Sequence, residues 1–144
     1  AAARMIEAGV DPGAVYRRLY EGIPLGDLRL AGRAVAGARS ELDGRLVVAV
    51  ITPADERAAG GTDSDGVVEA LRGAQGAQVA AVIRQVADGE WRVSTRASGG
   101  EIDVSAIAAR EGGGGHRAAA GFTSHRSPDE IIALIRQAML DQGA

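Results

Sequence analysis

Residues 78–98 read QVAAVIRQVADGEWRVSTRAS, and this stretch decides the fold. Its first part, residues 78–86, is an apolar run rich in β-branched side chains, which predicts a buried strand. The dipeptide Asp88-Gly89 that follows is typical of a two-residue hairpin turn. From Glu90 to Ala97 apolar and polar side chains alternate, as they do in a strand with one packed face and one polar face. We therefore expect the two segments to pair as antiparallel strands.

A second apolar run lies upstream, where residues 45–51 read RLVVAVI. Such a run predicts a strand buried on both faces, at the centre of the sheet. Capping residues and first-turn prolines predict helices around these strands. The expected helix starts are Asp11-Pro12, Pro24, Thr52-Pro53, Thr62 or Asp63, Asp103 and Ser127-Pro128, and Phe122-Thr123 is expected to be a short returning strand. The predicted fold is α/β, with a mixed β-sheet flanked by helices and preceded by a helical inter-domain connector.

Composition limits the function. The chain has 144 residues, a net charge of −3, no cysteine and only two histidines, His116 and His125. The charge argues against a surface that holds long duplex DNA, and the missing thiols exclude disulfides and thiolate metal sites. No apolar run approaches the ~20 residues of a membrane span, and no signal peptide opens the chain. We expect a cytoplasmic protein without a membrane partner.

The strongest functional signal is the run GGGGHRAAAG at residues 112–121. Consecutive glycines let backbone N–H groups approach an anion without obstruction by Cβ atoms. His116 and Arg117 come directly after the glycines, and both side chains can donate hydrogen bonds to phosphate oxygens. The alternative is a flexible linker, but linkers of that kind are usually rich in serine and flanked by polar sequence. The run therefore predicts a phosphate-binding loop.

A polar strand face is expected opposite this loop. Ser94, Arg96 and Ser98 fall on the same side of the alternating strand, so they are predicted to line a cleft and hold a phosphate or a ribose. The alternative is an outer strand whose polar face meets only water. His116 also has an alternative, in which its ring caps a nearby helix end by bonding a backbone carbonyl.

The acidic residues of the chain do not predict a metal site. Asp63 and Asp65 fall at the start of an expected helix, where capping explains them, and Asp103 is read in the same way. No cluster of aspartates and histidines with hydrolytic character is present in the sequence. The chain is thus predicted to bind a phosphate and to contain neither a catalytic residue nor a metal ligand.

Three segments together resemble a known family. They are RVSTR at residues 92–96, IDVSAIA at 102–108 and GGGGHRAAAG at 112–121. This pattern resembles the C-terminal domain of the Asp-His-His (DHH) phosphoesterases, most closely the branch of nanoRNases and 3′-phosphoadenosine-5′-phosphate (pAp) phosphatases. The segment around Leu19-Tyr20-Glu21 and Pro24-Leu25 is similar to the helical connector of those enzymes. The resemblance implies that residues 1–42 are this connector with the end of a catalytic domain, and that residues 43–144 are the DHH-associated substrate-binding domain.

The resemblance also implies a function. By this resemblance, the chain is expected to be the substrate-binding half of a manganese-dependent phosphoesterase that hydrolyses short oligoribonucleotides and pAp. Gly113, Gly114, Gly115, His116 and Arg96 would hold the substrate. The Mn²⁺ ions would belong to a preceding DHH domain, which is then the expected partner, and this chain alone would be inactive. The alternatives are a non-catalytic nucleotide- or RNA-binding module, the substrate domain of a cyclic di-AMP phosphodiesterase, and a homodimerisation element.

Overall fold

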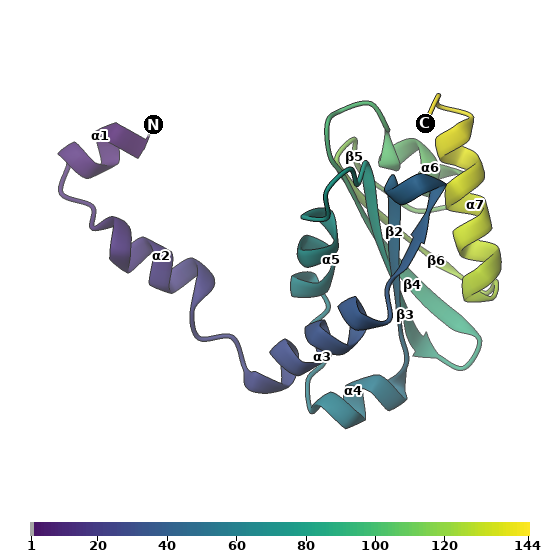
Figure 1. Ribbon diagram of the computed structural model, residues 1–144, viewed down its shortest axis with the longest axis horizontal. Coiled ribbons are helices and arrows are strands. Elements are labelled where there is room, and N and C mark those ends of the chain that lie inside the picture. Colours follow the sequence, from purple (N-terminus) through teal and green to yellow (C-terminus); the bar gives the residue numbers. More distant parts are fainter. Residues whose placement is uncertain (1) are drawn as a thin grey trace.

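The computed structural model describes residues 2–144, which form a six-stranded mixed sheet with helices on both faces (Figure 1). This arrangement confirms the predicted α/β fold class. The strands are β1 (Arg39–Glu41), β2 (Leu46–Ile51), β3 (Val79–Ala87), β4 (Glu90–Ala97), β5 (Gly114–His116) and β6 (Ala119–Ser124). The helices are α1 (Ala2–Glu7), α2 (Pro12–Tyr20), α3 (Leu25–Ala36), α4 (Pro53–Ala59), α5 (Asp65–Arg72), α6 (Val104–Arg110) and α7 (Pro128–Leu140).

The strand order across the sheet is β1-β2-β3-β4-β6-β5. β2 and β3 are parallel and are joined by a crossover that contains α4 and α5, whereas the other neighbouring pairs are antiparallel. The hairpin predicted from residues 78–98 is confirmed, with a bulge between Gln85 and Ala87. The predicted strand at residues 45–51 is β2, which lies inside the sheet between β1 and β3 as expected.

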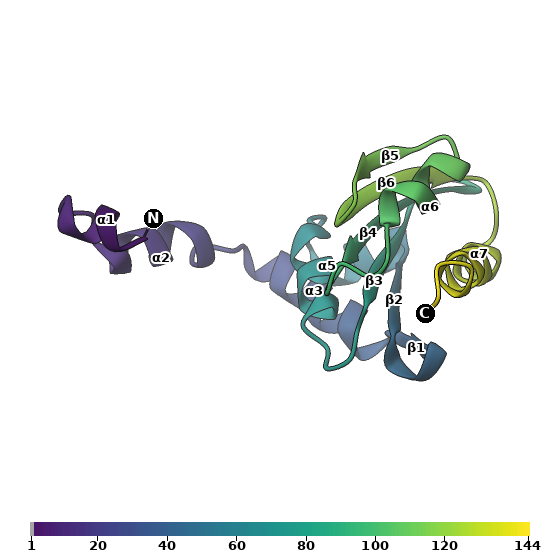
Figure 2. The same cartoon turned by 90° about the horizontal axis from the view of Figure 1, so that it is seen from above.

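The sheet separates two hydrophobic clusters because alternate residues of a strand point to opposite faces. On one face, α6 and α7 pack against side chains such as Ile83 and Val93. On the other face, α3 and α5 pack against side chains such as Ile51 and Val82. Figure 2 shows the sheet between these two layers. α5 contacts β2, β3 and β4, and so it leaves the β6 and β5 part of this face without a helix.

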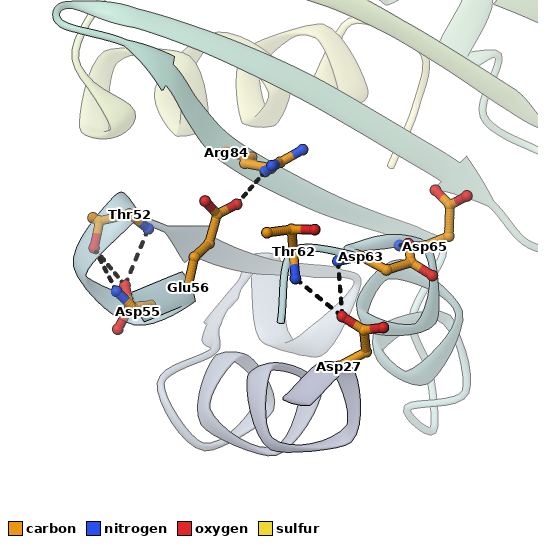
Figure 3. A network of polar contacts seen from close by, with 8 residues as sticks. All are labelled: Asp27, Thr52, Asp55, Glu56, Thr62, Asp63, Asp65 and Arg84. Carbon is orange, nitrogen blue, oxygen red and sulfur yellow. Dashed lines mark hydrogen bonds and ion pairs between the residues drawn. The ribbon is translucent and has the colours of Figure 1, made fainter. Parts of the chain in front are cut away.

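The N-terminal helices differ in how they relate to this sheet. α1 and α2 extend away from the domain and bury no residue (Figure 1). α3, in contrast, packs closely against the end of α4. A Cβ atom on Gly26 would lie 1.9 Å from the Gly60 carbonyl oxygen, so only glycine permits this approach. Asp27 Oδ1 also accepts hydrogen bonds from the backbone N–H groups of Thr62 and Asp63 (Figure 3). No helix among residues 2–144 is long and apolar enough to cross a membrane.

Two local expectations differ from the structure. The predicted caps of α5 were Thr62 or Asp63, but the N-cap is Ser64, and Asp63 instead accepts a hydrogen bond from the N–H of Asp65. The glycine run was expected to be a loop, yet Gly114–His116 forms the edge strand β5. Glycine has little intrinsic preference for strands, so this strand exists because of its pairing with β6. The expected caps Asp103 and Ser127 are confirmed, and the predicted returning strand at Phe122-Thr123 is part of β6.

Candidate functional site

An open cleft of about 930 Å³ lies over the part of the sheet that no helix covers. Its floor is formed by β4, β6 and β5, and the N-terminal residue of α5, Asp65, stands at one wall. Cavities of this size accommodate small-molecule ligands. The predicted residues Ser94 and Arg96 line it together with the glycine run. The cleft opposite the glycines, which the alternation in β4 predicted, is therefore present.

The strand register shows how the floor is built. Residues directly opposite one another in an antiparallel ladder project from the same face of the sheet. Ser94 is opposite Gly121, and Gly121 is opposite Gly114, so these three residues form a row across β4, β6 and β5. The two glycines carry no side chain, so only backbone atoms form the cleft floor beside the Ser94 hydroxyl.

A second row lies beside the first. Arg96 is opposite Ala119, and Ala119 is opposite His116. The same register rule places the guanidinium of Arg96 and the imidazole of His116 on one face, on either side of the small Ala119 side chain. His116 is exposed, as expected for a residue of an edge strand. Arg96 and Ala119 line the cleft, whereas His116 lies on the same face of the sheet but is not among the cleft's lining residues.

The glycines of the run have different roles. A Cβ atom on Gly113 would lie 2.2 Å from the Gly121 carbonyl oxygen, and one on Gly115 would lie 2.4 Å from that of Ala119. Both positions therefore need glycine so that the chain can approach β6. A Cβ atom on Gly114 would meet no atom within 4 Å, and Gly114 lies on the cleft face of the sheet. Packing does not require glycine at Gly114, whose missing side chain instead keeps the cleft floor accessible.

Neighbouring residues hold Arg96 at the edge of the cleft. Its Nε lies 3.3 Å from Oε1 of Glu69, and its Nη1 donates a hydrogen bond to the Thr95 carbonyl at 3.1 Å. Glu69 also pairs with Arg72 at 2.7 Å, so one carboxylate is shared between two guanidiniums. The side chain of Arg96 is 27% exposed, which leaves part of the guanidinium available to a ligand.

Two of the predicted site residues are engaged elsewhere. Arg117 donates a hydrogen bond to the Gly100 carbonyl and pairs with Asp103, at the start of α6. Ser98 follows β4, and its N–H donates to the Gln78 carbonyl. Neither residue lines the cleft described above. The alternation of β4 suggested Ser98, and the glycine motif suggested Arg117. Neither local pattern shows the direction that the chain takes after it.

The cleft also contains charged groups that the site prediction did not include. Arg92 lines it from the same face of β4 as Ser94 and Arg96, as its position two residues before Ser94 in an alternating strand implies. The carboxylates of Asp65, Glu90 and Glu111 line the walls, and Glu111 forms an ion pair with Arg126. Positive charge is thus confined to particular positions, which favours a ligand with discrete anionic groups over a long polyanion.

The helix that leads into the glycine run is anchored at its start. The Asp103 carboxylate accepts hydrogen bonds from the Ser105 hydroxyl and from the N–H groups of Ser105 and Ala106. The Ser105 hydroxyl first, and then these N–H groups, hold the pKa of Asp103 below its ordinary value. Among residues 2–144, no three acidic or histidine side chains converge in a way that could hold a metal ion. The side chains of Arg92, Ser94 and Arg96 in the cleft can donate hydrogen bonds to an anion.

The fold and the cleft define an α/β domain with an open cleft on an uncovered sheet face. The DHHA1 domain model matches residues 43–141, and the chain belongs to this family, the C-terminal domain of DHH-family proteins.

Solved structures share the fold. An exopolyphosphatase-related protein from Bacteroides fragilis superposes with a TM-score of 0.83 at 20% identity, covering 97% of this chain and 42% of its own. A pGpG-specific phosphodiesterase from Vibrio cholerae superposes with a TM-score of 0.59 at 16% identity, covering 81% of this chain and 40% of its own. This chain thus spans less than half the length of each of these proteins.

Proposed function

We propose that this chain is the substrate-binding part of a manganese-dependent phosphoesterase that hydrolyses short oligoribonucleotides and pAp, as in the nanoRNase and pAp phosphatase branch. One observation carries the proposal. Arg96, His116 and the open Gly114 lie on one face of β4, β6 and β5, where Arg96 and Gly114 line the same cleft. An arginine, an imidazole and unobstructed backbone are the groups that bind a phosphate ester.

Each of these groups has a defined part in binding. The guanidinium of Arg96, oriented by Glu69, provides a charge-assisted contact to one phosphate. His116 donates from the opposite side of Ala119. The Ser94 hydroxyl, in the adjacent row, is placed to contact the ribose or a second phosphate oxygen. Ser98 and Arg117 support the surrounding backbone through the contacts described above.

The hydrolytic step would belong to another part of the polypeptide. Manganese ions, bound by a preceding DHH domain, would activate the attacking water. Residues 2–144 show no side-chain set that could hold these ions. The likeness to a pGpG-specific phosphodiesterase supports a nucleotide ligand with a phosphodiester bond. The competing proposals are a cyclic di-AMP phosphodiesterase and a nucleotide-binding module without catalysis.

Isothermal titration of the 144-residue chain with pAp tests the proposal. Arg96→Ala removes a charge-assisted contact of about 1.5–3 kcal/mol, so affinity should fall roughly ten- to a hundredfold. Arg136→Ala is the matched control, because Arg136 lies on α7, on the opposite face of the sheet. It should bind pAp as the unmodified chain does. Equal affinity of the Arg96→Ala variant and the unmodified chain would remove Arg96 from the site and refute the proposal.

Activity assays separate the alternatives. The chain alone should bind pAp but show no turnover with or without Mn²⁺, whereas a polypeptide that includes a DHH domain should hydrolyse it. Preferential hydrolysis of cyclic di-AMP by that polypeptide would favour the first competing proposal. Binding without hydrolysis in both forms would favour the second.

A further inference from the structure

Arg92 is a cleft residue that the proposed phosphate site does not use. It is exposed on β4, four residues before Arg96 and on the same face. It lines the cleft and also a smaller neighbouring cavity of about 240 Å³ near Asp63 and Asp65. Among residues 2–144 it forms no ion pair within 4.0 Å and no side-chain hydrogen bond, unlike Arg84 and Arg96. Its guanidinium is therefore free to bind a ligand.

The position of Arg92 is unfavourable for stability. Arg92 is directly opposite Arg84 in the β3–β4 ladder. Like charges that face one another across a ladder destabilise a sheet unless a counter-charge compensates them. Arg84 is compensated, because its Nε lies 2.5 Å from Oε1 of Glu56 (Figure 3). Arg92 is not, and structure alone gives no reason for an arginine there.

The distance between the two cleft arginines separates their roles. At about 3.3 Å per strand residue, the Cα atoms of Arg92 and Arg96 are about 13 Å apart, with Ser94 midway. Glu69 holds Arg96 at its own end of the cleft. The carboxylates of Asp65 and Glu90 line the same space and disfavour an anion bound away from the guanidiniums. The cleft thus has two separate cationic positions.

We propose that Arg92 is a second anion-binding residue, which holds a second phosphoryl group of a ligand whose first phosphoryl group lies at Arg96. This inference rests on the proposed function, and it assigns to Arg92 the discrimination between nucleotides with two phosphoryl groups and nucleotides with one. A 5′-phosphorylated dinucleotide satisfies both arginines. A mononucleotide with one phosphate satisfies only Arg96 and leaves Arg92 in water.

Binding measurements on the 144-residue chain test this role. The probes are adenosine 5′-monophosphate, with one phosphate, and a 5′-phosphorylated diadenylate, with two. Arg92→Gln should weaken the diadenylate about ten- to a hundredfold and change the monophosphate affinity by less than about twofold. The second value is small because the single phosphate lies at Arg96 and makes no direct contact with Arg92, while salt screens the remaining attraction. Arg136→Gln, which makes the same charge change on α7, should alter neither affinity.

Thermal unfolding provides a second readout. Arg92→Gln relieves the repulsion with Arg84, so its midpoint should equal that of the unmodified chain or exceed it by a few degrees. A clear drop would make Arg92 a structural residue and overturn the inference.

Other binding outcomes are equally decisive. If Arg92→Gln lowers the affinity for both probes equally, or for neither, the role of Arg92 is overturned. If Arg96→Ala then abolishes binding of both probes, the proposed function is still supported. An unmodified chain that binds neither probe at millimolar concentration would overturn both proposals.

Discussion

Two adjacent glycines of the run should respond in opposite ways to the same added methyl group. A Cβ atom on Gly114 meets no atom within 4 Å, and the backbone of Gly114 does not have a positive φ. Gly114→Ala should therefore leave stability unchanged or raise it by about 0.5 kcal/mol, because alanine loses less backbone entropy on folding. The methyl group projects from the cleft face of the sheet, where a phosphate would approach. We expect the affinity for pAp to fall at least about tenfold, from a lost charge-assisted contact.

Gly113→Ala is the matched comparison. Its Cβ atom would lie 2.2 Å from the Gly121 carbonyl oxygen and 2.5 Å from Cβ of Phe122, so β5 must move. Overpacking of this kind costs about 1–3 kcal/mol. At roughly 4 °C per kcal/mol, the thermal midpoint should fall by about 4–12 °C.

Calorimetry and titration with pAp on both variants measure the two effects separately. A Gly114→Ala variant that binds pAp as tightly as the unmodified chain would refute the assignment of Gly114 to the cleft floor. A Gly113→Ala variant with an unchanged midpoint would refute the packing explanation.

Two further substitutions test the electrostatics. Glu69→Gln should raise the affinity for pAp about threefold, because it removes a negative charge beside the proposed phosphate contact of Arg96. A like charge at an assumed separation of about 6 Å in water costs about 0.7 kcal/mol, and the amide oxygen can still accept from Arg96. An unchanged or lower affinity in titration would show that the carboxylate charge itself is required to orient Arg96. Asp103→Asn should reduce the loss of thermal stability between pH 6 and pH 3. The folded-state pKa of Asp103 is lowered by the Ser105 hydroxyl, so its contribution is full above the unfolded pKa of about 4 and is lost as pH falls through the folded value. An identical pH dependence in the two proteins would contradict this origin.

The sequence predicted the elements whose signals are local. The hairpin of β3 and β4 followed from alternation and from Asp88-Gly89, and the start of α7 followed from Ser127 and Pro128. The apolar run of β2 predicted its place inside the sheet because it has no polar face to expose. Each of these patterns involves only residues that are close together in the sequence.

Pairing between distant segments could not be predicted in the same way. β5 is a strand of glycines and one histidine, and only its register with β6 makes it one. β1, a short edge strand of polar residues, has no apolar pattern and was not expected. The same limit applies to the site. Ser94 and Arg96 were placed on one face by alternation, whereas the contacts that turn Arg117 toward Gly100 and Asp103 depend on the path of the chain between β4 and α6.

The central claim is that a nucleotide phosphate binds on the uncovered face of β4, β6 and β5. Chemical-shift mapping of the backbone amides of the ¹⁵N-labelled chain, titrated with pAp, tests it most directly. We expect the largest shifts at residues 112–115 and at Ser94, Arg96 and Gly121, with little change along α7 on the opposite face. Saturating ligand that shifts the amides of α7 as much as those of the glycine run, or that shifts neither, would contradict the claim.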